Sequence, residues 1–261
     1  MNIKGTKTGV FCISIDLELL WGRRDMPNLY YFEKRIPEER RVIDKLLALF
    51  KKYKIPATWA TVGKIYEKGD SNYSGLDIIK KIKDTPNQEI GSHSYTHPVF
   101  TDISKSEAII EFKDFKQKSF VYPRNKIKYL KELKNSGFKS YRGADKNQRE
   151  LLIPRNPPIY NPVITDGILN IRGSMYFVSG RGLKRFLPQG LRFIKSKMGI
   201  DSAIKQNKVF HLWFHPMDFV DDSQKIFSDF EKLLDYASNK RNTGKLSIMN
   251  MGQISNAYTR N

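Results

Sequence analysis

The sequence of 261 residues contains one cysteine, Cys12, and no apolar run close to the ~20 residues that a membrane-spanning helix needs. A lone thiol excludes an intramolecular disulfide, and this fits a reducing compartment, so we expect a cytoplasmic protein. Residues 1–7 lead directly into a strand-like segment without a small-residue cleavage site, so we expect no signal peptide. Repeats and low-complexity tracts are absent too, which favours one domain over residues 1–261.

Acidic residues are scarce, because 27 Asp and Glu stand against 46 Lys and Arg, and the net charge is +19. Such a charge attracts anionic partners, a class that includes nucleic acids, anionic glycans and membrane faces. No helix-turn-helix, zinc-finger or RNA-binding motif accompanies the charge, so we expect no nucleic-acid partner. A lysine-rich, solvated surface is the simpler interpretation.

Strand-like and helix-like segments alternate along the chain, and this alternation predicts a parallel sheet, either open or closed into a barrel. The strand-like segments are residues 10–16, 57–63, 89–92, 119–123, 139–142, 209–215 and 245–249. Helical patterns cover residues 37–53, the segment after a capping box at Ser104, residues 126–135 and residues 222–239. The proline-rich stretch 150–207 shows no clear order of elements.

All four histidines occur in pairs with the same spacing, His93 with His97 and His211 with His215, near the ends of strand-like segments. The carboxyl ends of parallel strands meet at one edge, where sites are commonly built. Pro98 disfavours a helix at His97, so we expect a turn there. The first pair could bind one metal ion, although the spacing alone also fits two loop histidines that make only hydrogen bonds.

Two acids, Asp16 and Glu18, follow the first strand-like segment and point the same way if the strand continues. One acid can bind a metal while the other takes a proton from water. Two imidazoles, one carboxylate and water make a catalytic zinc arrangement. A solvated loop after the strand is the alternative interpretation.

The segment 209–215 places His211, Trp213 and His215 on one face and only apolar side chains on the other. We expect the apolar face to pack on helices and the histidine face to line a barrel interior. At ~3.3 Å per residue, His211 lies roughly 13 Å deeper than His215, so both cannot contact one reacting atom. We interpret His215 as the chemical residue and His211 as an interior residue with a hydrogen-bond partner.

Five blocks now carry a family resemblance: Ser-Ile-Asp-Leu-Glu at 14–18, Ala-Thr-Trp-Ala-Thr-Val-Gly at 57–63, Glu-Ile-Gly-Ser-His-Ser-Tyr-Thr-His-Pro at 89–98, Tyr-Pro-Arg-Asn at 122–125 and Phe-His-Pro at 214–216. In this order they resemble the polysaccharide deacetylase family, the NodB-like carbohydrate esterases. The chain is similar to a subgroup with an Asp-x-Glu first block and a Pro-Arg-Asn third block. The resemblance implies a single α/β domain with a distorted (β/α)7-type barrel. It also implies a metal-dependent hydrolase that removes an N-acetyl or other acyl group from an amino sugar in a glycan or glycan precursor.

By position, the resemblance implies Asp16 as the catalytic base and His215 as the general acid. Glu18, His93 and His97 correspond to ligands of a divalent metal, most simply zinc, with cobalt, nickel or manganese as alternatives. Zinc would activate water, Asp16 would accept the water's proton, and His215 would protonate the leaving amine.

Further residues have implied roles. Arg124 and Arg142 are expected catalytic residues, with Arg142 orienting the base, and a backbone N–H after Pro123 is an expected oxyanion donor. The expected substrate-binding residues are Trp21, Tyr95, Asn125 and Trp213, although core packing is the simpler role for Trp213 and for Trp59. The chain departs from the family's commoner pattern, because it lacks two adjacent Asp residues, an Arg before Pro123 and an Asp-x-x-Asp-Trp block.

Residues 182–198 combine apolar residues at helical spacing with many basic residues. A basic amphipathic helix can lie on an anionic membrane face, which would suit a lipid-linked glycan at the inner membrane face during cell-surface glycan biosynthesis. Pro188 and Gly190 interrupt this pattern, and an ordinary barrel helix is the alternative.

Other functions stay open at this point. They are hydrolysis of another C–N amide bond, such as a cyclic amide, and a non-catalytic glycan- or membrane-binding role. The presence of both acids and all three histidines near them favours an enzyme. A nucleic-acid binder would show strongly salt-dependent association with DNA or RNA.

Overall fold

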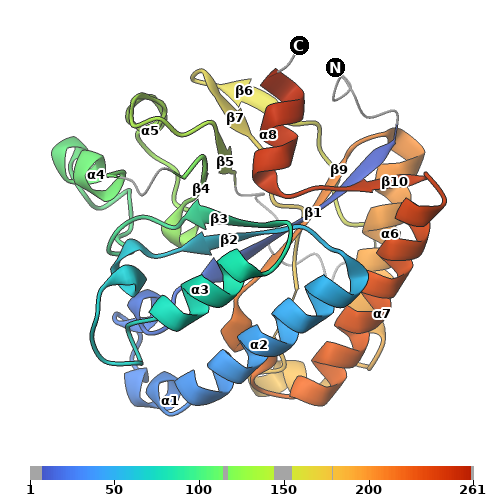
Figure 1. Ribbon diagram of the computed structural model, residues 1–261, viewed down its shortest axis with the longest axis horizontal. Helices are drawn as coiled ribbons and strands as arrows, with labels where there is room; N and C mark the ends of the chain where they lie inside the picture. Colours follow the sequence, from blue (N-terminus) through green and yellow to red (C-terminus); the bar gives the residue numbers. More distant parts are fainter. Residues whose placement is uncertain (1–7, 114–116, 144–154, 178, 260–261) are drawn as a thin grey trace.

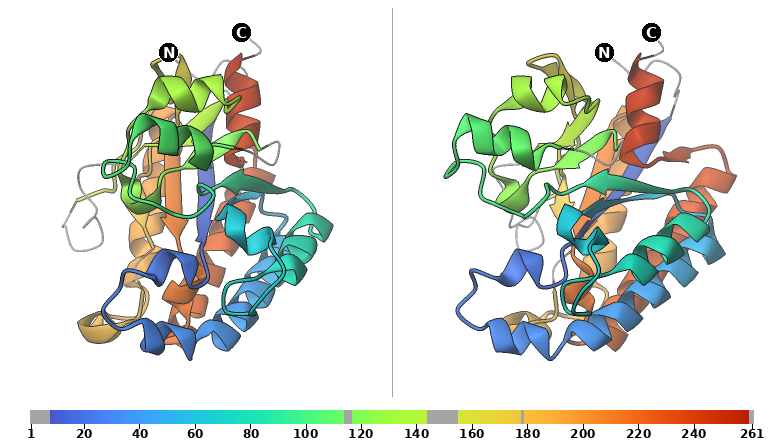
Figure 2. Two further views of the ribbon diagram at one scale, coloured as in Figure 1. Left: turned by 90° about the vertical axis from the view of Figure 1, so that its left-hand side faces the viewer. Right: turned by 60° about the vertical axis from the view of Figure 1, so that its left-hand side comes forward.

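A computed structural model describes residues 8–113, 117–143, 155–177 and 179–259. In this part of the chain, ten strands form one sheet that curls into a distorted barrel, with helices on its outer face (Figures 1 and 2). The predicted α/β class and the distorted (β/α)7-type barrel are therefore confirmed.

The sheet is parallel except at one hairpin. Its strands are β1 (Gly9–Leu17), β2 (Ala57–Thr61), β3 (Gln88–Ser92), β4 (Ser119–Val121), β5 (Ser140–Arg142), β6 (Val163–Thr165), β7 (Ile168–Asn170), β8 (Met175–Tyr176), β9 (Val209–Phe214) and β10 (Leu246–Ile248). Their order is β6-β7-β5-β4-β3-β2-β1-β9-β8, and β10 also pairs with β1. Only β6 and β7 pair antiparallel among the described strands. Each expected strand occurs with ends shifted by a few residues at most, and β6, β7 and β8 lie in the stretch that the sequence pattern did not order.

One segment, residues 168–177, closes the ring. Ile171 N donates to the carbonyl of Tyr141 in β5, and Phe177 N donates to the carbonyl of Trp213 in β9. The segment thus passes from one edge of the curled sheet to the other without reversing direction. Together with β1 to β5 and β9, it gives the seven positions of a (β/α)7 ring.

Helices and short 3-10 turns connect the strands. The helices are α1 (Leu29–Glu33), α2 (Ile36–Tyr53), α3 (Leu76–Asp84), α4 (Lys105–Glu111), α5 (Leu130–Asn135), α6 (Leu191–Gln206), α7 (Ser223–Asn242) and α8 (Met251–Thr259). The 3-10 turns are η1 (Trp21–Arg23), η2 (Gly63–Tyr66), η3 (Pro123–Asn125), η4 (Gly182–Phe186) and η5 (Pro216–Phe219). None of the described helices is both long and apolar enough to span a bilayer.

Two helix starts match the sequence signals. In α2, Pro37 lies in the first turn beside two glutamates, as predicted. The capping box before α4 is also confirmed, because Ser104 and Glu107 each satisfy the other's backbone N–H. By contrast, α5 begins later than expected, because Tyr129 has a left-handed φ of 62° and separates the preceding residues from the helix.

The alternation of β1 divides apolar from polar surroundings. Phe11, Ile13 and Ile15 belong to the cluster that packs against the outer helices. On the inner face, Cys12 joins an apolar cluster that α8 closes with Met251. Ser14 and Asp16 follow on that inner face, also buried. Polarity inside the barrel therefore increases toward the carboxyl ends of the strands.

Residues 182–198 do not form one continuous basic amphipathic helix. The segment is divided into η4 and α6, because Gly190 adopts a φ of +88° just before α6 begins. Helix α6 packs against α7 and β1, and its Arg192 and Lys195 are buried. It is thus an ordinary barrel helix, and η4 is a separate exposed turn.

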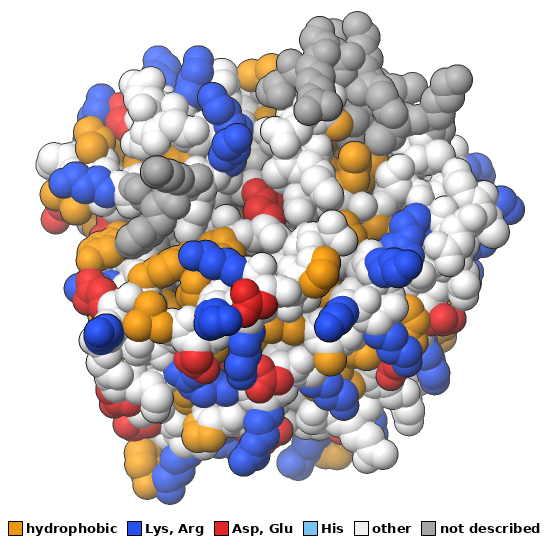
Figure 3. Space-filling model, in the orientation of Figure 1, with side chains coloured by type: hydrophobic (Ala, Val, Ile, Leu, Met, Phe, Trp, Pro, Cys, Tyr) orange, Lys and Arg blue, Asp and Glu red, His pale blue; other side chains and the backbone are white. Residues whose placement is uncertain are grey.

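Basic residues do not gather in a single stripe on the face shown in Figure 3. There, Lys and Arg side chains lie dispersed among acidic, apolar and neutral ones. This face fits the interpretation of the +19 charge as a solvated surface.

A substitution at Phe177 tests how much the closing segment 168–177 stabilises the barrel. Its ring is fully buried and stacks on Phe219 with centroids 5.6 Å apart. Because Phe177→Ala leaves a cavity where the segment 168–177 closes the barrel, we expect a loss of about 3–5 kcal/mol in the free energy of unfolding, measured by urea denaturation. Phe186→Ala removes an exposed ring and should change it by less than about 0.5 kcal/mol. Equal losses in the two variants would contradict this account.

Candidate metal centre

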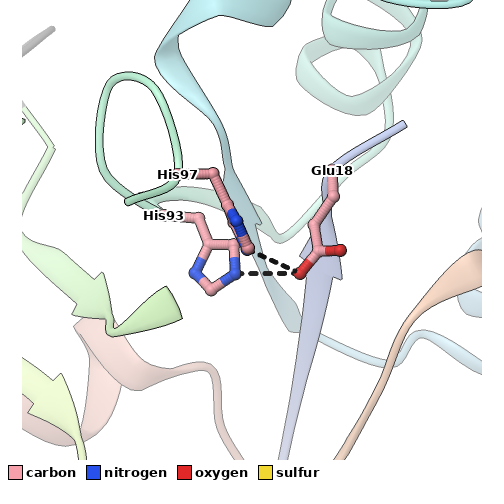
Figure 4. Close-up of side chains that lie close together, drawn as sticks. All are labelled: Glu18, His93 and His97. Atoms are coloured by element: carbon pink, nitrogen blue, oxygen red, sulfur yellow. Dashed lines mark hydrogen bonds and ion pairs between the residues drawn. The ribbon is translucent and has the colours of Figure 1, made fainter. Parts of the chain in front are cut away.

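The carboxylate of Glu18 is the meeting point of three histidines. Its Oε1 lies 3.1 Å from Nε2 of His93 and 3.1 Å from Nε2 of His97 (Figure 4). Nε2 of His215 lies 3.3 Å from the same oxygen. These side chains follow β1, β3 and β9, so the carboxyl ends of strands in one part of the sheet bring them together, as the sequence predicted.

The hydrogen bond of His93 Nδ1 determines whether Nε2 has a lone pair available for a metal ion. Nδ1 lies 2.7 Å from the carbonyl of Val121, and because a carbonyl only accepts, Nδ1 carries the proton. In the neutral ring, Nε2 then has a lone pair, which points at the carboxylate of Glu18. Two lone pairs facing each other repel, so a proton or a cation must lie between them. A metal ion fits this arrangement, since a carbonyl on the second nitrogen is the usual support for a metal-binding imidazole.

A second sign of a cation site is the unused oxygen of Glu18. Its Oε2 is buried and has no hydrogen-bond partner among the described residues, although it forms an ion pair with Arg23 Nη2 at 3.8 Å. A Cβ on Gly22 would lie 1.8 Å from this oxygen, so only glycine fits beside it. Burial alone would raise the pKa of Glu18, but the nearby imidazoles, that of His215 foremost, hold its pKa well below the usual value.

The loop that carries the two imidazoles is strained and supported. Ser94 and His97 both have a φ of 64°, a conformation that costs a residue with a side chain roughly 1–2 kcal/mol. The Ser94 hydroxyl accepts from His97 N at 3.0 Å. From α4, Glu111 accepts from the backbone N–H groups of Tyr95 and Thr96 at 2.9 and 2.7 Å. The predicted turn is confirmed, whereas Glu111 could not be found from the sequence, because its partners lie 15 and 16 residues away.

Asp16 is held as a carboxylate by Arg142. Nη1 and Nη2 of the arginine donate to the two carboxylate oxygens, each at 2.7 Å. Burial would raise the pKa of Asp16, but Arg142 outweighs it, with help from His93, and the pKa is lowered. Arg142 also donates to Asn125 Oδ1 at 3.3 Å. Arg142 thus contacts both oxygens of the Asp16 carboxylate, and Asn125 contacts the arginine.

Below Arg142, a chain of hydrogen bonds leads into the barrel. Nη1 of Arg142 also donates to Ser14 Oγ at 2.9 Å, and this hydroxyl lies 2.9 Å from His211 Nε2. His211 Nδ1 donates to the carbonyl of Ile171 at 3.1 Å. Burial, assisted by Arg142, lowers the pKa of His211 to about 3, so its ring is neutral and accepts from Ser14. The predicted interior position and partner of His211 are confirmed.

His215 is held in the opposite charge state. Its Nδ1 donates to Asp218 Oδ2 at 3.1 Å, and Tyr176 donates to Asp218 Oδ1 at 2.5 Å. Burial alone would lower the pKa of His215, but Glu18 and Asp218 outweigh it and raise the pKa to about 10. The ring is therefore a proton donor whose Nε2 lies 3.8 Å from Asp16 Oδ2. Sequence reasoning missed Asp218, although its position three residues after His215 is the spacing of a capping box, which η5 forms.

Arg124, which the resemblance implied as a catalytic residue, contacts the turn after Glu18. It has a φ of 54°, and its Nη2 donates to the carbonyl of Gly22 at 3.0 Å and to Asp25 at 2.5 Å. It ties η3 to the turn after Glu18.

His97 is a neutral ring. Burial and, to a smaller extent, Arg124 lower the pKa of His97.

The aromatic residues expected at the substrate divide into two groups. Trp213 lies under the guanidinium of Arg142, 4.5 Å from ring centroid to Cζ, and packs on Tyr176, so it is a wall of the site. Trp21 and Tyr95 are half-buried and contact other residues. The Trp21 ring is covered by Arg24, and the Tyr95 hydroxyl donates to Glu67.

One buried acid behind the site was not predicted. Glu39 in α2 is 2% exposed, and burial raises its pKa to about 7 against the effect of Arg23. Burial alone would lower the pKa of Arg23, but the carboxylates of Glu18, Asp218 and Glu39 outweigh it and raise the pKa.

The donor atoms form two overlapping sets. Glu18, His93 and His97 offer one ligand atom each within 4.8 Å of one another, and so do Asp16, Glu18 and His215. The first set is the predicted one, and its two nitrogens and one carboxylate oxygen are donors that zinc prefers. The second set contains the protonated ring of His215, which cannot bind a metal in that state.

Family and fold comparisons agree with this description. A family model described as "Polysaccharide deacetylase" matches residues 31–119, about a third of the chain, which includes His93 and His97. No curated protein sequence is significantly similar to the chain.

Solved structures share the fold at low sequence identity. A protein from Mycobacterium smegmatis assigned as a polysaccharide deacetylase has a TM-score of 0.73 and 12% identity over 98% of this chain and 92% of its own. The allantoinase Puue has a TM-score of 0.69 and 12% sequence identity, and the match covers 100% of this chain and 94% of the allantoinase. A 4-α-glucanotransferase from Thermococcus litoralis has a TM-score of 0.64 and 14% sequence identity. That match covers 95% of this chain but only 40% of the glucanotransferase. At such identities these structures show the fold alone, and together with the family match they confirm the resemblance to the polysaccharide deacetylases.

The metal ligands can be tested by zinc binding. Glu18→Gln keeps the volume of the side chain but removes the charge, so we expect zinc affinity to fall at least about tenfold in isothermal titration calorimetry. His211→Gln is the control, because His211 lies deeper in the barrel and should leave zinc affinity unchanged. Equal affinities of wild type and Glu18→Gln would contradict the ligand assignment.

His211 also predicts a pH dependence of stability. In the unfolded chain its pKa is near the ordinary value of ~6.5, but in the fold it is about 3, so the unfolded state binds more protons below pH 6.5. The free energy of unfolding should therefore fall by up to about 1.4 kcal/mol per pH unit between pH 6.5 and 4 through this residue. His211→Gln lacks the effect, so the stability advantage of wild type should shrink as the pH drops. A constant difference between pH 7 and 4 in urea denaturation would show that His211 does not stay neutral.

Proposed function

We propose that this chain is a metal-dependent hydrolase that removes an N-acetyl or other N-acyl group from an amino sugar in a glycan or glycan precursor. The observation that carries the proposal is the juxtaposition of an ionised acid, a protonated histidine and a candidate metal site in one buried cluster. The family match over residues 31–119 supports the substrate class.

Glu18, His93 and His97 would hold the divalent metal, with zinc the first choice and cobalt, nickel or manganese as alternatives. When bound, the metal would lower the pKa of a water molecule and polarise the amide carbonyl. The carbonyl of Val121 keeps His93 in the tautomer that presents Nε2 to the site.

Asp16 is the proposed general base. Arg142 holds both its oxygens, which keeps the carboxylate ionised at neutral pH and fixes its direction. It can accept the proton of a water molecule as that water attacks the amide carbon. The backbone N–H after Pro123 remains our proposal for a donor to the oxygen of the tetrahedral intermediate.

His215 is the proposed general acid. It can pass the Nε2 proton to the amine nitrogen as the C–N bond breaks, while Asp218 keeps hold of the Nδ1 proton. The products are then a carboxylic acid and a free amino sugar. The pKa of about 10 belongs to a ring beside an uncompensated Glu18, and positive charge bound at Glu18 would lower it toward neutral pH, where a proton donor works best.

The remaining assignments concern substrate and setting. We propose that Trp21 and Tyr95 contact the sugar, while Asn125 and Trp213 act mainly through Arg142. The buried thiol of Cys12 and the lack of other cysteines support our proposal of a cytoplasmic setting, in the biosynthesis of a cell-surface glycan.

A cyclic amide is the second candidate substrate, because an allantoinase shares the fold over the whole of this chain. The same base and acid could serve that reaction, since it also breaks a C–N amide bond. Ring opening without acetate release would favour it. A non-catalytic relative would instead bind a glycan equally well with and without Asp16→Asn, and neither form would turn it over.

Acetate release from N-acetylated oligosaccharides tests the proposal. We expect Asp16→Asn in the zinc-loaded protein to lower kcat at least about 100-fold, because the amide side chain cannot accept the water's proton. Zinc content, measured in the same samples, should stay at the wild-type value.

Asp44→Asn is the matched control, since this exposed acid pairs with Lys81 on the surface and should keep full activity. Undiminished acetate release by Asp16→Asn would refute the assignment of the base.

A further inference from the structure

Turn η4 presents large apolar side chains to solvent. Leu183 is 86% exposed and Phe186 is 69% exposed, and Tyr30 in the neighbouring α1 is 66% exposed. Single exposed apolar residues are common, but three on two adjacent segments form a patch that water solvates poorly. We call residues 181–186 together with Tyr30 the η4 patch.

Cations surround these apolar residues. Arg181 packs over the rings of Tyr31 and Phe32 at 4.7 and 4.6 Å, which attaches η4 to α1. Lys184 and Arg185 lie between Leu183 and Phe186 in the sequence, and both are exposed.

The nearest acids already have partners. Asp221 accepts from Tyr31 and pairs with Arg35 at 3.3 Å, and Asp222 pairs with Lys225 at 3.6 Å. The charge left over on the η4 patch is therefore positive.

The patch adjoins the candidate metal centre. A cleft of about 330 Å³ is lined by Arg181 and Lys184 of the patch and also by Asp218, which accepts a hydrogen bond from His215. In Figure 2, the turn lies beside α1 at the end of the molecule toward which the arrows of β1 and β9 point. The patch and the reacting groups thus share one face.

We propose that the η4 patch docks this face on an anionic lipid bilayer. Leucine and phenylalanine would enter the boundary between headgroups and acyl chains, and the three basic residues would contact lipid phosphates. The shape of the tip favours a bilayer, because a Cβ on Gly182 would meet nothing within 4 Å and η4 therefore projects outward. A soluble polyanionic glycan explains the cations but offers no apolar phase for Leu183.

Docking also narrows the substrate class, and this step rests on the proposed function. The cleft shares Asp218 with the candidate centre and Arg181 and Lys184 with the patch, so a sugar carried by a membrane lipid would be presented on the docked face, beside the reacting groups. We therefore infer that the N-acylated sugar is attached to an anionic lipid carrier.

Vesicle co-sedimentation of the full chain tests the docking. We expect binding to phosphatidylcholine vesicles that contain phosphatidylglycerol, and much weaker binding to pure phosphatidylcholine or at high salt. The double variant Leu183→Ser with Phe186→Ser should bind at least about tenfold more weakly. Ile164→Ser is the matched control, because Ile164 is 62% exposed on β6, outside the patch, and should leave binding unchanged.

Activity on a water-soluble N-acetylated saccharide separates the two proposals. The double variant should keep that activity, so loss of vesicle binding alone concerns the η4 patch and loss of activity in wild type concerns the proposed function. No binding of wild type to anionic vesicles at low salt would overturn the docking. So would equal weakening by Ile164→Ser, or a solution dimer that the double variant abolishes, since the patch would then contact a second copy of this chain.

Discussion

The arrangement of the site depends on one carboxylate oxygen that faces three imidazole nitrogens at 3.1 to 3.3 Å. Such a cluster is stable only when positive charge lies among these atoms, as protons or as a cation. The fold gives His93 a carbonyl that fixes its tautomer and gives His215 an acid that keeps it protonated. It thereby gives chemically identical side chains different surroundings, which is why we propose one as a ligand and the other as a proton donor.

The barrel produces this division through its layers. At the amino ends of the strands the interior is apolar and closed by α8. Above it, the neutral ring of His211 supports Arg142 through Ser14, and Arg142 supports Asp16. Each polar residue therefore rests on a partner one layer deeper. Since burial raises the cost of an unpaired charge, the pairing of Asp16 with Arg142 keeps the acid both ionised and fixed in direction.

Patterns local in sequence predicted much of this. Alternation in β1 and β9 placed Asp16, His211 and His215 on the inner face, because strand periodicity follows from the backbone alone. Partners distant in sequence could not be predicted in the same way. Glu111 and Tyr176 meet the site only through the folded arrangement, and residues 168–177 close the ring within a stretch whose prolines obscured any period. The roles of Arg124 and Arg142 depend on side-chain direction, which spacing does not specify.

X-ray absorption at the zinc edge of the zinc-loaded protein tests the central claim most directly, because it counts imidazole and oxygen donors around the ion. The account predicts two imidazole nitrogens with oxygen donors completing the shell, and one imidazole fewer in His97→Ala. A shell without imidazole, an unchanged shell in that variant, or a protein that takes up no zinc would contradict it.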